Sequence, residues 1–136
     1  MSLVRGHAFL FDLKNEPAHL WVIASDPDIE GYCLIVSLTS FKGNSDRTVV
    51  LNAGEHPFIK WPTCVAYSLS ELITAEQLIN YVSLGHAKMH LAPLTEKVIE
   101  LVFDGFLASQ FTKRRIKTYV RASKDKKVIE TAVLTY

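Results

Sequence analysis

A chain of 136 residues has the length of one domain with a single core. Its content of 49% apolar and 21% charged residues excludes a disordered chain. A formal net charge of +1 provides no overall field that would favour nucleic acid or a membrane. We find no apolar run close to the roughly 20 residues that span a bilayer and no signal-peptide pattern. We therefore expect a cytoplasmic protein without membrane association.

The first half of the chain predicts β-strands. Apolar runs rich in β-branched and aromatic residues alternate with turn signals such as Asp26-Pro27-Asp28. The third run is almost continuously apolar, which indicates a strand covered on both faces. Five short strands joined by tight turns predict a small, curled antiparallel barrel. The predicted strands are residues 8–13, 20–25, 32–38, 48–51 and 63–67.

Two cysteines, Cys33 and Cys64, fall within these strand-like runs. Cysteines within apolar strand segments typically act as small, buried hydrophobic residues, and their thiols stay free in a reducing compartment. We expect neither a disulfide nor a cysteine metal site.

The hydrophobic period changes after about residue 70. Thr74 and Gln77 form a T-x-x-Q capping box, which predicts a helix through Val82, and Gly85 follows the end of that helix. Pro93 precedes a second predicted helix, in which apolar residues at helical spacing indicate a core-facing stripe. That stripe consists of Val98, Leu101, Val102 and Phe106, and the helix begins after Thr95.

The remaining segments complete an α+β protein that is mainly β in its first half. Residues 111–121 continue or restart the helix, and residues 123–136 form a tail or a last strand. We see no linker or internal repeat, so residues 1–136 are predicted to form one domain. Its barrel covers about residues 6–70 and its helical part about residues 71–122.

Positive charge is concentrated near the C-terminus. Eight of the fifteen Lys and Arg residues lie between positions 113 and 127, against one acid, Asp125. Such a run forms either a solvated helix face or a phosphate-binding patch. Arg114 and Lys117 are the candidate contacts to RNA within it.

Several familiar chemistries have no motif in this chain. It contains no glycine-rich phosphate loop, no H-E-x-x-H or paired-cysteine metal motif and no G-x-S-x-G elbow. His86 and His90 have i, i+4 spacing, but Gly85 and Pro93 bracket them and no third ligand is near. We expect these histidines at the surface or between helices, and we expect no metal and no cofactor.

The connection between the fourth and fifth strands carries unusual side chains for a turn. His56 and Lys60 lie within it, and Tyr67 ends the following strand. Imidazole can transfer protons near neutral pH, and lysine can hold an anion. In the alternative interpretation, Phe58 and its apolar neighbours cap the barrel end, and a carbonyl group satisfies His56.

Further polar residues lie at the ends of predicted strands. His19 precedes the second strand, Thr39 and Lys42 follow the third, and Arg47 precedes the fourth. Alternate connections of a curled antiparallel sheet emerge at one end, so His19, the 39–47 loop and Tyr67 can border one mouth. These groups suffice for metal-free RNA cleavage, in which a base takes the 2′-OH proton and an acid protonates the 5′-oxygen.

Residues 6–70 resemble the MazF/PemK family of toxins from bacterial toxin–antitoxin systems. The resemblance rests on Gly6 before the first strand, on Glu16-Pro17-Ala18-His19, on the apolar run that follows and on Val36-Ser37-Leu38-Thr39-Ser40. Two departures are His19-Leu20, where the family has arginine and proline, and the 54–59 stretch. The resemblance implies an SH3-like barrel with helices, a homodimer and endoribonuclease activity.

Three functional hypotheses follow. In the first, the protein is a toxin that cleaves single-stranded RNA, with a cognate antitoxin as partner. His56, His19 and Thr39 are then the catalytic residues, and the substrate-binding residues are Arg47, Lys60, Lys42, Tyr67, Arg114 and Lys117. In the second, it is a non-catalytic SH3-like module that binds a protein or a nucleic acid through the cationic region. In the third, it is a structural or phage-derived partner protein.

Overall fold

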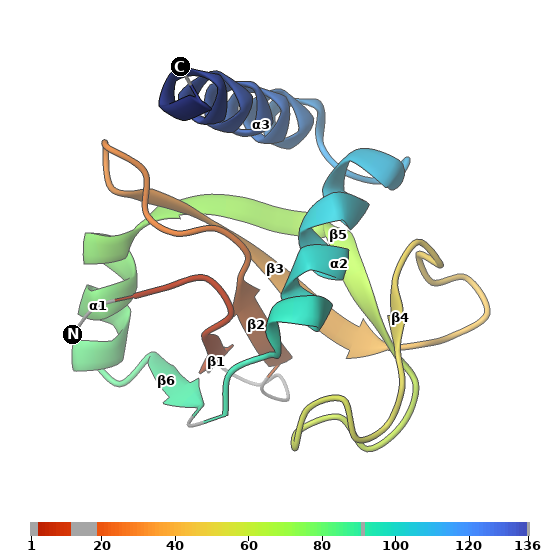
Figure 1. The fold of residues 1–136 in the computed structure, drawn as a ribbon. Helices are drawn as coiled ribbons and strands as arrows, with labels where there is room; N and C mark the ends of the chain where they lie inside the picture. Colours follow the sequence, from red (N-terminus) through yellow and green to blue (C-terminus); the bar gives the residue numbers. More distant parts are fainter. Residues whose placement is uncertain (1–2, 12–18, 91, 136) are drawn as a thin grey trace.

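The computed structural model describes residues 3–11, 19–90 and 92–135, with side chains up to Lys126 in the last helix. Within these residues the chain forms strands and helices in a mixed order (Figure 1). The strands are β1 (Ala8–Phe11), β2 (His19–Ile23), β3 (Tyr32–Ser40), β4 (Val50–Leu51), β5 (Thr63–Thr74) and β6 (Ala87–His90). The helices are α1 (Ala75–Ser83), α2 (Glu96–Ala108) and α3 (Arg114–Thr135).

The strands form one antiparallel sheet in the order β4-β5-β3-β2-β1-β6. The predicted α+β class with a mainly β first half is confirmed, but the barrel is not closed, because β4 and β6 each pair on one side only. A register shift separates the pairs Ile35↔Glu71 and Ser37↔Ala66, so β5 carries extra residues opposite β3. Such a bulge increases the local bend of a strand.

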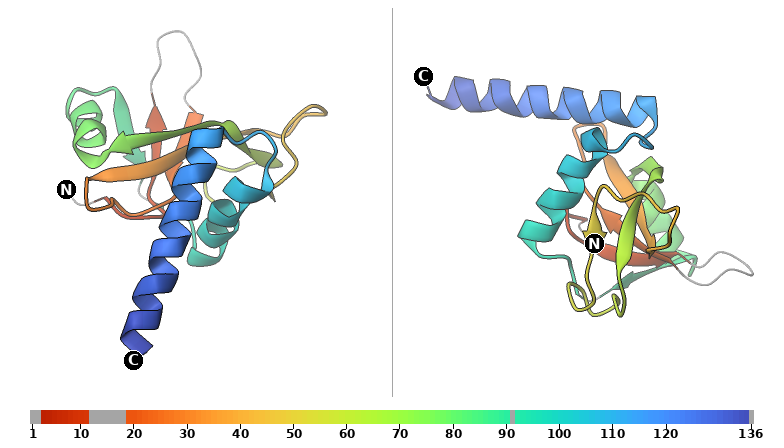
Figure 2. Two further views of the ribbon diagram at one scale, coloured as in Figure 1. Left: turned by 90° about the horizontal axis from the view of Figure 1, so that it is seen from above. Right: turned by 90° about the vertical axis from the view of Figure 1, so that its right-hand side faces the viewer.

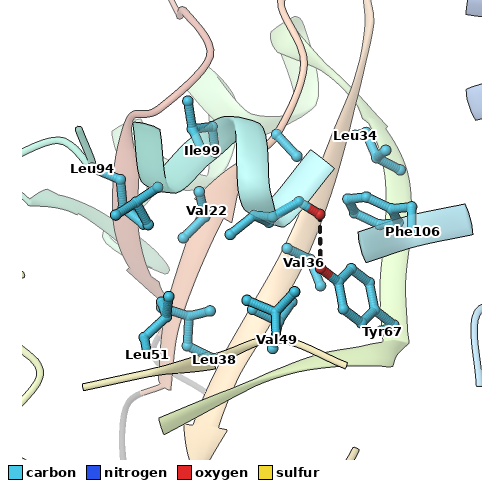
Figure 3. Close-up of a cluster of buried hydrophobic side chains, with 14 of the residues drawn as sticks. Val22, Leu34, Val36, Leu38, Val49, Leu51, Tyr67, Leu94, Ile99 and Phe106 are labelled. Carbon is cyan, nitrogen blue, oxygen red and sulfur yellow. Dashed lines mark hydrogen bonds between the residues drawn. The ribbon is translucent and has the colours of Figure 1, made fainter. Parts of the chain in front are cut away.

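Each face of the sheet has its own apolar cluster. On one face, α2 and the start of α3 cover the sheet; this cluster includes Val36, Tyr67 and Phe106 (Figure 3). On the other face, α1 covers a second cluster that includes Phe9 and Leu78. Residues 33–38 of β3 are all buried, so the prediction of a strand covered on both sides is confirmed.

The capping residues predicted both helix starts. The Thr74 side chain accepts from the Gln77 N–H, and the Gln77 side chain accepts from the Thr74 N–H, which completes the capping box of α1. The Thr95 side chain accepts from the Val98 N–H at the start of α2. These local hydrogen bonds satisfy N–H groups that the first helical turn leaves free.

Several predicted boundaries differ from the structure. β5 continues to Thr74 because residues 71–74 pair with the start of β3 after the bulge. Residues 87–90 lie in the region predicted to be helical, but they form β6 because they pair with β1. The described part of the first strand ends at Phe11, and residues 12 and 13 lie outside the described residues.

The prediction of a tail or strand over residues 123–136 is wrong. Helix α3 runs without interruption from Arg114 to Thr135, since this stretch contains no glycine or proline that would end it. Its first half packs on the body through Ile116 and Val120, whereas its second half extends past the body (Figure 2). In the part of the chain that the structure describes, no helix combines the length and apolar character of a bilayer-spanning segment.

Candidate nucleic-acid interface

His56 is a buried link between two loops. Its side chain is only 2% exposed, and its Nε2 lies 2.6 Å from the Ala92 carbonyl oxygen. Nδ1 accepts a hydrogen bond from the Phe58 N–H at 3.0 Å. Because a carbonyl oxygen only accepts, Nε2 carries the proton, and the imidazole is neutral with both nitrogens engaged.

Burial lowers the pKa of His56, which outweighs the opposing effect of the Ala92 carbonyl, and His90 lowers that pKa further. The two histidine rings meet edge to face with centroids 4.7 Å apart. This arrangement matches the capping interpretation of the connection, in which a carbonyl satisfies His56. It leaves no free nitrogen for proton transfer.

Tyr67 is a core residue, in contrast to the expectation that it borders a binding mouth. Its hydroxyl donates to the Val102 carbonyl oxygen at 2.7 Å (Figure 3), and burial raises its pKa. A Cβ atom at Gly105 would lie 1.8 Å from the Tyr67 hydroxyl oxygen. The glycine in α2 therefore makes room for this side chain.

His19 and Thr39 lie at the same end of neighbouring strands. Trp21 of β2 pairs with Ser37 of β3. His19 lies two residues before Trp21, and Thr39 lies two residues after Ser37, so both lie at this end of the two strands. His19 is exposed and Thr39 is half-buried. Among the described residues, no hydrogen bond joins either side chain to His56.

The connections on either side of β4 are joined at an exposed tryptophan. The Trp61 indole Nε1 donates to the Ser40 hydroxyl at 2.7 Å, and the Phe41 N–H donates to the Pro62 carbonyl at 2.9 Å. Trp61 nevertheless remains 58% exposed. The hydrogen bond fixes the edge of the ring while most of the side chain stays in contact with solvent.

Three exposed cations lie on the two connections that meet at this tryptophan. Lys60 precedes it in the chain, and Lys42 follows the Phe41 that pairs with Pro62. The Arg47 guanidinium lies 5.6 Å from the centroid of the Phe41 ring, a cation–π distance. We call the group the Trp61 surface; its members are Phe41, Lys42, Arg47, Lys60 and Trp61.

The acids of these two connections already have hydrogen-bond partners within the protein. Asp46 accepts from the Ser109 hydroxyl at 2.6 Å and from the Thr48 N–H at 2.9 Å. Burial alone would raise the pKa of Asp46, but the hydrogen bonds from Ser109 and Thr48 outweigh it and lower the pKa. Glu55 accepts from the Asn52 N–H. In the described chain, no acid forms an ion pair with Lys42, Arg47 or Lys60.

The sequence pattern singled out the three cations of the Trp61 surface but missed its aromatic members. In the alternative interpretation of this connection, Trp61 is one of the apolar residues that cap the barrel end; it is instead exposed. Ile59, two residues earlier in the same connection, is buried, so no local pattern separates the exposed Trp61 from its buried neighbour.

The candidate RNA contacts Arg114 and Lys117 lie on α3, in a different element from the Trp61 surface. Among the described residues, no three His, Cys, Asp or Glu side chains gather as a metal site would require. Comparison of the chain with models of protein families, with curated proteins and with solved structures finds no match.

Proposed function

We propose that the protein is a non-catalytic module that binds single-stranded RNA through the Trp61 surface. The observation that carries this proposal is the exposed indole of Trp61, whose only polar atom is already bound to Ser40. An anchored ring presents its π-face to a base without a large loss of side-chain entropy.

The composition of the Trp61 surface suits a flexible, negatively charged strand. Aromatic side chains stack on bases with little sequence preference, and each stacked base contributes about 1–3 kcal/mol. Lys42, Arg47 and Lys60 are exposed and free of ion pairs among the described residues, so they can contact phosphates without breaking an existing pair.

The toxin hypothesis is the second candidate. His19 and Thr39 lie at the sheet end that also carries Ser40, the partner of Trp61. RNA stacked on Trp61 would then pass close to an exposed imidazole and a hydroxyl. Under this hypothesis the protein cleaves RNA, binds a cognate antitoxin and forms a homodimer.

The test is binding of a labelled oligouridine, measured by fluorescence anisotropy at low salt. Loss of one stacking contact in Trp61→Ala should weaken binding by about 10- to 100-fold, and Trp61→Phe should retain part of the affinity. The matched control is Tyr32→Ala, which removes a partly exposed aromatic at the opposite end of β3.

Equal binding by the wild-type protein and Trp61→Ala, or no binding by either, would refute the proposal. The same samples are analysed for RNA fragments by gel electrophoresis. We expect intact RNA; fragments that disappear in His19→Gln would instead support the endoribonuclease.

A further inference from the structure

The cations of residues 113–124, at the start of α3 and just before it, fall into two groups by their partners. Those that face the body are paired: Lys113 and Arg115 bind the Glu71 carboxylate at 2.6 and 2.7 Å, and Lys124 binds Asp104 at 3.3 Å. Ion pairs are one way in which a helix is fixed to a neighbouring element, so these three cations have a structural role.

A second group faces away from the body. Arg114, Lys117 and Arg121 have i, i+3, i+7 spacing, which places them on one side of a helix over a length of about 10 Å. The opposite side carries Ile116 and Val120, which are fully buried. We call the three cations the α3 stripe.

The α3 stripe has no ion pair among the described residues. Its N-terminal end adjoins a shallow depression of about 620 Å³, lined by Lys113, Arg114, Arg115 and Thr118. Of the three cations in this lining, Lys113 and Arg115 are bound to Glu71, and Arg114 has no ion pair among the described residues. One acid, Asp125, follows Arg121 by a helical turn.

We propose that the α3 stripe is a separate site for the sugar–phosphate backbone of nucleic acid. This second proposal rests on the proposed function only because the α3 stripe and the Trp61 surface would both bind nucleic acid. Because the stripe has cations and no aromatic ring, it can neutralise phosphates but cannot stack on bases. It therefore accepts a duplex, whose bases are unavailable to Trp61, as well as a single strand.

A blunt-ended DNA duplex tests this site without the other one. On B-DNA, each neutralised phosphate contributes about 0.9 to the slope of log K against log salt concentration. The double variant Arg114→Glu with Lys117→Glu should weaken duplex binding and reduce that slope by about 1.8. Trp61→Ala should leave duplex binding unchanged.

The control is Lys88→Glu with Lys97→Glu, which changes the net charge equally at exposed positions on β6 and α2. An equal loss in this control would mean that net charge, and not the α3 stripe, drives binding, and would overturn the proposal. The proposal would also be overturned if the wild-type protein did not bind the duplex at low salt, or if it bound anionic lipid vesicles and not the duplex. Oligouridine binding that depends on Trp61 would survive either result, so the two proposals can fail independently.

Discussion

At the scale of single residues, His56 shows how burial changes the use of a titratable group. The neutral ring fills both of its hydrogen-bonding positions within the protein, and protonation would add a hydrogen to Nδ1, where the Phe58 N–H already points. The connection that carries Trp61 is thus held to Ala92 by an uncharged imidazole.

The buried, neutral His56 predicts that the free energy of unfolding decreases in mild acid. The pKa of His56 in the folded protein lies below its usual value of 6.5, so the unfolded chain binds more protons between those two values. The stabilising contribution is complete above about pH 6.5 and decreases as the pH falls through that value, by at most about 1.4 kcal/mol per pH unit.

Urea denaturation at several pH values between about 7.5 and 5.5 measures this decrease. The variant His56→Gln has no imidazole to protonate and should show a flatter dependence. The carboxyl groups of Asp46 and Glu71 have lowered pKa values and lose their contribution only in more acidic solution. Identical profiles for the two proteins would show that His56 does not titrate in this range.

At the scale of elements, α3 is held by contacts from three parts of the chain. Ile116 and Val120 enter the core under α2. The Tyr119 hydroxyl donates to Asp28 at 2.7 Å, beside the β2–β3 turn. Glu71 of β5 binds Arg115 of the helix and Lys113 just before it, and its half-exposed position limits the contribution of those ion pairs. Apolar burial is therefore the main source of attachment.

Substitution of a single buried residue of α3 tests whether apolar burial is the main source of its attachment. Ile116→Ala removes a fully buried side chain and should lower the free energy of unfolding by about 2–5 kcal/mol. Thr118→Ala, at an exposed position two residues away, should change it by less than about 1 kcal/mol. Chemical denaturation measures both variants, and equal stabilities would contradict the packing of α3 on the body.

At the scale of the whole molecule, the surface carries the sheet edges β4 and β6 and apolar side chains on β5, at the end of α1 and on α2 that a partner could cover. Leu69, Leu84 and Leu101 are all more than half exposed, so the prediction that Leu101 belongs to the core-facing stripe of α2 is wrong. Large apolar side chains at a surface favour association when they lie together, and the resemblance to the toxin family also implies a dimer.

We predict a homodimer in solution. Multi-angle light scattering at micromolar concentration should give about twice the chain mass of 15.3 kDa. The control is the same measurement at high salt, which should preserve a dimer held by apolar contacts and weaken one held by charge. A mass of one chain in both conditions would contradict the prediction.

Features that depend on near neighbours in the chain were predictable from the sequence. The starts of α1 and α2 follow from Thr74 and Thr95, whose side chains reach N–H groups three residues ahead. The buried character of β3 follows from its continuous apolar run. In each case a short segment contains both partners, or the whole pattern, of the interaction.

Contacts between distant residues were decided by the tertiary structure alone. His56 meets a carbonyl 36 positions away, and Tyr67 finds its space because Gly105, on another element, lacks a side chain. The same holds for β6, which is a strand because β1 lies beside it. Which cations of residues 113–124 have an ion pair in the described chain likewise depends on where Glu71 and Asp104 are placed. Local propensity carries no information about such partners, since chain folding alone brings them together.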